Sequence, residues 1–127
     1  MQFEAISTPA APAAIGTYSQ AIRAGQTVYI SGQIPLDPAT GMLIEGSFQD
    51  RVRQVFQNLA AIAGAAGLSL GDTVKITVFL QDLARFSELN EEMTRHFVSP
   101  YPARAVVQVS ALPRNTDIEI DAILVRR

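Results

Sequence analysis

The amino-acid sequence predicts an α+β domain spanning residues 1–127, in which two helices cover one face of a mixed six-stranded sheet. Three observations support this prediction. The length of 127 residues suits one domain and allows a substantial core. Hydrophobic residues make up 48% of the sequence and charged residues 17%, which is typical of globular proteins rather than disordered ones. Segments with strand periodicity alternate with two segments of helical periodicity.

The N-terminal part is predicted to form the first strands. Residues 18–24 and 27–31 favour a hairpin around Ala24-Gly25-Gln26, and a further strand is indicated near residues 3–6. Residues 31–35 end the second hairpin strand and lead into a loop rich in turn-forming residues.

The strongest helical pattern covers residues 48–66. Ser47 is the expected N-cap, with Asp50 at the third helical position, and Gly67 is the expected C-terminal stop. Seven apolar residues share one face at 3.6-residue spacing, namely Phe48, Val52, Val55, Phe56, Leu59, Ile62 and Ala66. The polar residues expected to lie off this face are Arg51, Arg53, Gln57 and Asn58.

The second half of the chain supplies three more strands and the second helix. Strands are predicted over residues 73–80, 104–109 and 118–125, and a helix over residues 86–97 that ends before Pro100. The apolar positions of that helix are Phe86, Leu89, Met93 and Phe97. The strand residues expected beneath the helices are Val74, Ile76, Val78, Leu80, Ala105, Val107, Val109, Ile118, Ile120, Ala122 and Leu124.

The opposite face of the sheet is too apolar for contact with water alone. Its predicted members are Lys75, Thr77, Phe79, Arg104, Val106, Gln108, Glu119, Asp121, Ile123 and Val125. Two helices cannot cover both faces, so we expect a second copy of the chain to cover this one. The alternative is a few scattered exposed apolar residues, which is normal for a soluble protein.

The composition excludes several classes of function. With no cysteine and a single histidine, His96, the chain has no disulfide or thiol chemistry and cannot form a histidine-rich metal site. The net charge of −2 argues against a nucleic-acid partner, and the sequence has no phosphate-binding glycine motif. No apolar run is long enough to span a membrane, and the N-terminus lacks secretory-signal features, so a cytoplasmic location is expected.

Several polar residues are candidates for a site. Arg104 presents a planar fork that matches a carboxylate, although spacing alone favours a salt bridge at a subunit interface. Ser31 and Gly32, at a strand end, offer either ligand contacts or a turn. Tyr18 either donates a hydrogen bond or packs. His96 is interpreted as a solvated helix histidine.

Five separated segments carry a resemblance to a known family. They are Ala14-Ile-Gly-Thr-Tyr-Ser-Gln-Ala21, Ser31-Gly-Gln-Ile-Pro35, Ala65-Ala-Gly-Leu68, Val74-Lys-Ile-Thr-Val-Phe-Leu80 and Tyr101-Pro-Ala-Arg-Ala-Val-Val-Gln-Val109. The last is the most specific, because Leu112 and Ile118-Glu-Ile120 follow it at the family's distance. Over residues 9–127 the chain resembles the RidA family, also called the YjgF family.

The resemblance implies a chorismate-mutase-like fold and a homotrimer with ligand sites between subunits. It also implies hydrolysis of reactive 2-imino acids, such as 2-iminobutanoate and 2-iminopropanoate, or of their enamine tautomers such as 2-aminoacrylate. The products are 2-keto acids and ammonia, and the reaction protects pyridoxal-phosphate enzymes. Neither a metal nor a cofactor is expected, and the expected partners are the small substrate and two further copies of the chain.

The family's functional residues carry over to matching positions. By resemblance, Arg104 binds the substrate carboxylate and Glu119 holds the attacking water. The residues expected to line the cleft are Tyr18, Ser31, Gly32 and Asn90. Two positions depart from the family, because Thr17 stands where proline is frequent and Val106 where cysteine is frequent. The first departure affects the loop beside Tyr18, and the second excludes a thiol role.

Three other functions remain as alternatives at the level of sequence. A non-catalytic module of the same fold would bind a small carboxylate at Arg104. A ribonuclease or translation-inhibitor role, ascribed to some relatives, finds little support in an acidic chain with one histidine. Composition neither supports nor excludes a chaperone-like role. The physiological imine is not specified by the sequence.

Overall fold

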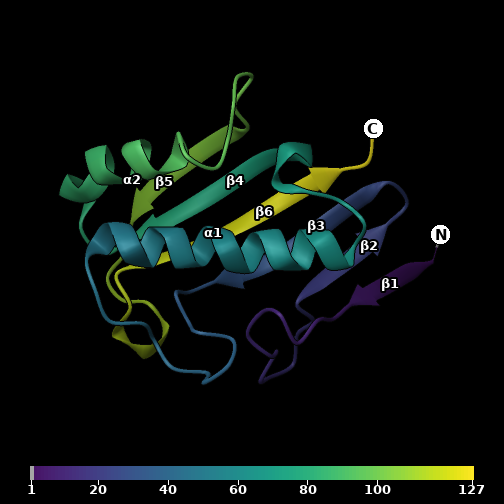
Figure 1. Cartoon of the computed structure of the whole chain (residues 1–127), viewed down its shortest axis with the longest axis horizontal. Helices are drawn as coiled ribbons and strands as arrows, with labels where there is room; N and C mark the ends of the chain where they lie inside the picture. Colours follow the sequence, from purple (N-terminus) through teal and green to yellow (C-terminus); the bar gives the residue numbers. More distant parts are fainter. Residues whose placement is uncertain (1) are drawn as a thin grey trace.

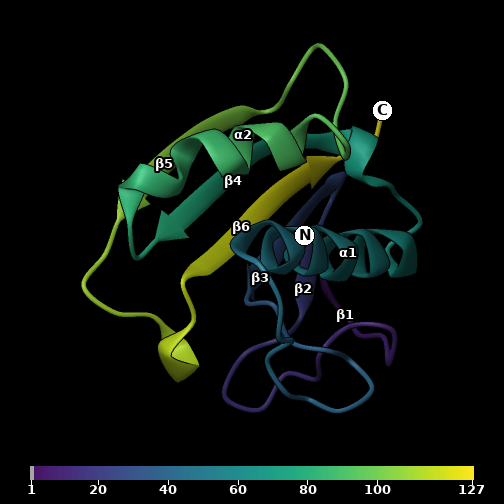
Figure 2. The same ribbon diagram turned by 60° about the vertical axis from the view of Figure 1, so that its left-hand side comes forward.

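The computed structural model describes residues 2–127 and contains one mixed sheet with two helices on the same face (Figures 1 and 2). The strands are β1 (Phe3–Ile6), β2 (Ala21–Ala24), β3 (Thr27–Gln33), β4 (Thr73–Leu80), β5 (Ala103–Gln108) and β6 (Ile118–Val125). The helices are α1 (Phe48–Ala65) and α2 (Phe86–Met93), with short 3-10 turns η1 (Leu70–Asp72), η2 (Leu83–Arg85) and η3 (Pro113–Asn115). The predicted α+β architecture with six strands and two helices is confirmed.

The strand order is β1-β2-β3-β6-β4-β5, in which only β4 and β5 run parallel. The C-terminal strand β6 therefore lies at the centre, and β1 and β5 form the two edges. The parallel β4–β5 pair is connected through α2, because parallel neighbours need a crossover segment. The buried face of β6 is the predicted one, comprising Ile118, Ile120, Ala122 and Leu124.

Helix α1 packs its apolar stripe on the sheet as predicted. Ser47 and Asp50 form a reciprocal capping box, and Gly67 follows the helix at a positive φ of 78°. The prediction that Asn58 lies off the buried face of α1 is wrong, because this residue is 1% exposed. It donates hydrogen bonds to the carbonyls of Ile34 and Leu36, so α1 anchors the loop after β3 through a buried amide.

Two predicted elements are shorter in the structure. The first hairpin strand begins at Ala21 and not at Tyr18, because the buried side chain of Gln20 bonds backbone groups of residues 8–12 instead of continuing the sheet edge. Helix α2 ends at Met93 and not at Phe97. Beyond it, the N–H groups of Arg95 and His96 bond carbonyls three residues earlier, which is a tighter turn than an α-helix.

The predicted faces of β5 are wrong. Arg104 pairs with Ile76 and Val106 with Val78, so both point to the helix-covered face, while Val107 points to the open one. Alternation could not decide this, because apolar residues occupy both faces of this edge strand. Val74 is also misassigned, since a register shift between Thr73 and Lys75 leaves it 45% exposed.

The face of the sheet opposite the helices is open in the single chain. Among the described residues, its apolar members include Tyr29, Phe79, Val107, Ile123 and Val125, which are exposed or partly buried. Coverage by a second copy stays a prediction. In residues 2–127 no helix is long and apolar enough to cross a membrane, and no cluster of metal-ligating side chains occurs.

Candidate functional site

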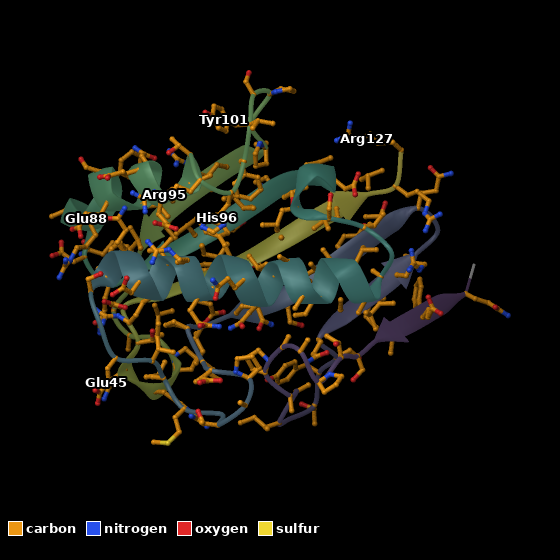
Figure 3. All side chains as sticks on the ribbon, viewed as in Figure 1. Glu45, Glu88, Arg95, His96, Tyr101 and Arg127 are labelled. Carbon is orange, nitrogen blue, oxygen red and sulfur yellow. The ribbon has the colours of Figure 1, made fainter. Side chains whose placement is uncertain are left out.

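The predicted site residues divide into two groups that line separate cavities. Four of them line a cavity of about 500 Å³ at one end of the sheet, namely Tyr18, Ser31, Gly32 and Glu119. Asn90 and Arg104 line a cavity of about 390 Å³ beside α2. A third cavity, of about 680 Å³, lies between η1, residues 96–102 and the last residues, and it holds none of the predicted site residues. In Figure 3, Tyr101 and Arg127 mark this region.

The first group is built around an irregular stretch of β3. The register with β6 shifts between Ile30 and Gln33, which turns Ser31 and Gly32 out of the regular ladder. The hydroxyl of Ser31 donates to the carbonyl of Ser19 at 2.6 Å. Tyr18 is 51% exposed, and its hydroxyl accepts from the N–H of Ile15 at 3.4 Å. These bonds hold the cavity wall in place.

Glu119 lies directly against Gly32 in this cavity. A Cβ atom at position 32 would overlap the Glu119 carboxylate, so only glycine permits this close approach. Burial raises the pKa of Glu119, and the nearby charge of Asp121 raises it further. The carboxyl group is therefore a stronger base than an exposed glutamate, as proton acceptance at a site requires.

The second group places the Arg104 guanidinium on one side of α2. Its Nη1 atom donates to Asn90 Oδ1 at 2.6 Å and contacts Met93 Sδ at 3.4 Å. Its Cζ atom lies 4.9 Å from the centre of the Phe86 ring. No carboxylate within residues 2–127 pairs with Arg104. The guanidinium is therefore held in place and available to bind an anion.

The two groups lie on opposite faces of the sheet within one chain. Arg104 is on the helix side of β5, whereas Glu119 pairs with Phe79 on the open side of β6. The predicted carboxylate-binding and water-holding residues are therefore not brought together by a single chain. Val106, one of the two departures from the resembled family, packs against the core beside Arg104.

Sequence reasoning missed a charged cluster where α2 faces α1 (Figure 3). The side chain of Glu92 is 0% exposed and bonds both Arg53 and His96. His96 is thus not the solvated residue that was predicted, because it is 15% exposed, bonds Glu92 at 2.7 Å and lies 4.9 Å from the ring of Phe56. The spacing of Glu92 and His96, four residues apart, was the available signal.

Three further residues beside the two groups were also missed. Phe86 and Met93 were assigned only to the apolar face of a helix, although both contact Arg104. Arg114 lines the cavity of Glu119 from a left-handed backbone position with φ of 57°, and its guanidinium donates to the carbonyl of Gly41. Nothing in the sequence indicated that η3 reaches this cavity.

Comparison with known proteins shows similarity over nearly the whole chain. Residues 8–126 match the family described as Endoribonuclease L-PSP. A mouse protein named 2-iminobutanoate/2-iminopropanoate deaminase is 47% identical over 121 residues, covering 95% of this chain and 90% of its own. The crystal structure of RidA from an Antarctic Psychrobacter is 53% identical with a TM-score of 0.94, covering 97% of this chain and 99% of that one. The crystal structure of Escherichia coli TdcF with bound serine is 44% identical with a TM-score of 0.92, covering 98% and 99%.

Proposed function

Because this chain belongs to the Endoribonuclease L-PSP family, with RidA proteins and 2-iminobutanoate/2-iminopropanoate deaminases among its relatives, we propose that it hydrolyses reactive 2-imino acids to 2-keto acids and ammonia. Candidate substrates are 2-iminobutanoate, 2-iminopropanoate and the enamine 2-aminoacrylate. Because 2-aminoacrylate attacks pyridoxal-phosphate enzymes, the activity would protect those enzymes.

The observation that supports this proposal most is the state of Arg104. A guanidinium that Asn90 and Phe86 hold in place, and that no carboxylate of the described chain neutralises, fits the carboxylate of a small acid. The relative from Escherichia coli was crystallised with serine, which also carries an α-carboxylate. The chemistry at the adjacent carbon then requires only water and a base.

Hydrolysis of a protonated imine needs modest assistance. Glu119 accepts a proton from a water molecule as the water oxygen bonds to the imine carbon. Glu119 then returns this proton to the nitrogen of the resulting carbinolamine. The C–N bond breaks, so that nitrogen leaves as ammonia, and the hydroxyl group gives its proton to the departing ammonia as the carbonyl of the keto acid forms. A positioned general base accelerates a reaction by about 10²–10⁴-fold. Holding the substrate and the water molecule together supplies the remaining rate enhancement. The hydroxyls of Tyr18 and Ser31 and the backbone at Gly32 are the candidate contacts for the nitrogen.

A complete site requires two copies of the chain in this proposal. Arg104 and Glu119 lie on opposite faces of the sheet, so one chain offers an anion-binding half and a water-activating half that face different directions. In a homotrimer with ring symmetry, the half containing Arg104 of one subunit meets the half containing Glu119 of the next. The open apolar face of the sheet supplies the surface that would hold such copies together.

The direct test is a coupled assay. A threonine dehydratase acting on threonine generates 2-iminobutanoate, which semicarbazide traps as a semicarbazone that can be followed continuously. We expect the purified protein to suppress semicarbazone formation, because hydrolysis removes the imine before it is trapped. An unchanged trapping rate with folded protein would overturn the proposal in favour of a non-catalytic module that binds a small carboxylate at Arg104.

Subunit complementation tests the divided site. Arg104→Ala and Glu119→Gln variants are each expected to retain at most about a hundredth of the wild-type activity, because each lacks one half of every site. After joint unfolding and refolding in equal amounts, about a quarter of the wild-type activity should return, since one pairing in four unites the two intact halves. Mixing without unfolding is the control and should restore nothing. Absence of recovery in mixed oligomers would mean that both residues act within one subunit or that the site is elsewhere.

A further inference from the structure

Glu92 is a fully buried carboxylate surrounded by donors from α1 and from the turn that follows α2. Arg53 on α1 donates from Nε at 3.1 Å and from Nη2 at 3.2 Å. His96 lies 2.7 Å away through Nε2, and Arg95 Nη1 is 3.7 Å away. Arg53 is itself held by Asp50, the capping residue of α1, at 3.3 Å. The cluster therefore connects the start of α1 to the end of α2.

Glu92 is ionised despite its burial. Burial alone would raise its pKa, but the hydrogen bonds from Arg53 and His96 outweigh that effect and hold the pKa below its ordinary value. A buried charge in such a network is costly to leave without its partners, so the network restricts where α2 can sit relative to α1.

Helix α2 depends on such contacts for its position. It has 8 residues, which is shorter than a helix that is stable alone in water. Leu89 and Met93 pack into the core, but apolar contacts tolerate small shifts that a forked arginine–carboxylate pair does not. Glu92 is the only buried charged residue among residues 2–127. Its bond to Arg53 is therefore the buried polar interaction that orients α2 relative to α1.

The same helix holds Arg104 on its other side. Phe86, Asn90 and Met93 follow one another at spacings of four and three residues, and all three contact the guanidinium. Glu92 is two residues from Asn90, which places the two side chains about 200° apart around the helix axis. A displacement of α2 at its Glu92 side would therefore move the groups that aim Arg104.

We propose that Glu92, with Arg53 and His96, is a positioning residue that fixes Asn90 and thereby aims Arg104 at its carboxylate ligand. This inference rests on the proposed function for the identity of the ligand. It assigns a role to a cluster that touches neither cavity group directly. The role depends on Glu92 itself and not on the total charge of α2.

The test compares Glu92→Gln with Glu91→Gln, which removes the same charge from the adjacent residue. Glu91 is a suitable control because its side chain is 64% exposed and makes a long ion pair with Arg95, at 4.0 Å. For Glu92→Gln we expect KM for 2-iminobutanoate and Kd for 2-oxobutanoate to rise roughly tenfold, with kcat little changed. The reason is that Arg104, which binds the carboxylate, is misplaced, whereas the base Glu119 is intact. Glu91→Gln should behave as wild type.

A second readout follows Arg104 without requiring turnover. In ¹⁵N NMR spectra, the Arg104 Nε–Hε signal should broaden or disappear in Glu92→Gln and stay sharp in Glu91→Gln. An unchanged signal in Glu92→Gln, or an unchanged KM in an active enzyme, would overturn the positioning role. Wild-type protein that neither turns over the imine nor binds 2-oxobutanoate would instead overturn the proposed function, whatever the NMR signal shows.

Two further variants cover the case in which Glu92→Gln fails to fold. Arg53→Met changes the other end of the pair at a side chain that is 38% exposed, and it should raise KM similarly. The double variant should be no worse in KM than the more affected single variant, because both remove the same coupling. Additive effects of the two substitutions on KM would show that Arg53 and Glu92 act separately and would overturn the proposal.

Discussion

Replacing Arg104 by alanine is expected to lower kcat/KM for 2-iminobutanoate by roughly 10²- to 10⁴-fold. Each hydrogen bond to a charged group contributes about 1.5–3 kcal/mol, and a bidentate carboxylate loses two of them. At about 1.4 kcal/mol per factor of ten, their loss gives this range. The coupled semicarbazide assay measures it.

Two variants make this result specific to the guanidinium. Arg104→Lys should recover only part of the activity, because an ammonium keeps the charge but not the planar fork. Arg127→Ala removes an arginine whose side chain is 80% exposed and should change neither activity nor oligomeric state. Full activity in Arg104→Ala protein that remains folded and oligomeric would refute the role of this residue.

Glu119→Gln is expected to lower kcat by about 10²–10⁴-fold while KM changes little, because the amide cannot accept the proton of the attacking water. The pH profile provides the second signature. Since burial and Asp121 raise the pKa of Glu119, wild-type activity should fall on the acid side at a higher pH than an ordinary glutamate would dictate. The residual activity of Glu119→Gln should lack this fall in rate at acid pH, which is the acid limb of the pH profile.

Asp121→Asn tests the cause of that acid limb without altering the base. Removing the like charge lowers the pKa of Glu119, so the group remains ionised at lower pH and the limb should shift in the acid direction. Steady-state rates measured across the acid range decide between the outcomes. A limb that persists in Glu119→Gln would assign it to another group and remove Glu119 from the role of base.

The periodicity of the sequence determined the layered architecture. An apolar stripe of 3.6-residue spacing identified α1, including its capping box at Ser47, and strict alternation identified the buried face of β6. These predictions succeeded because local spacing decides which side of a helix or central strand can be buried. The resemblance then named candidate residues that the structure finds beside cavities.

Only the tertiary structure decided which faces the candidate residues occupy and which polar side chains are buried. Apolar residues on both faces of β5 left its orientation open, and pairing with β4 turned Arg104 toward α2 and away from Glu119. Asn58 and Glu92 were predicted as ordinary helix-surface residues or left unassigned, yet both are buried. The physical reason is that a polar side chain is buried at low cost only where hydrogen-bond or ion-pair partners are already in place. Those partners, the carbonyls near residue 35 and the guanidinium of Arg53, are distant in sequence and meet these side chains only in the folded chain.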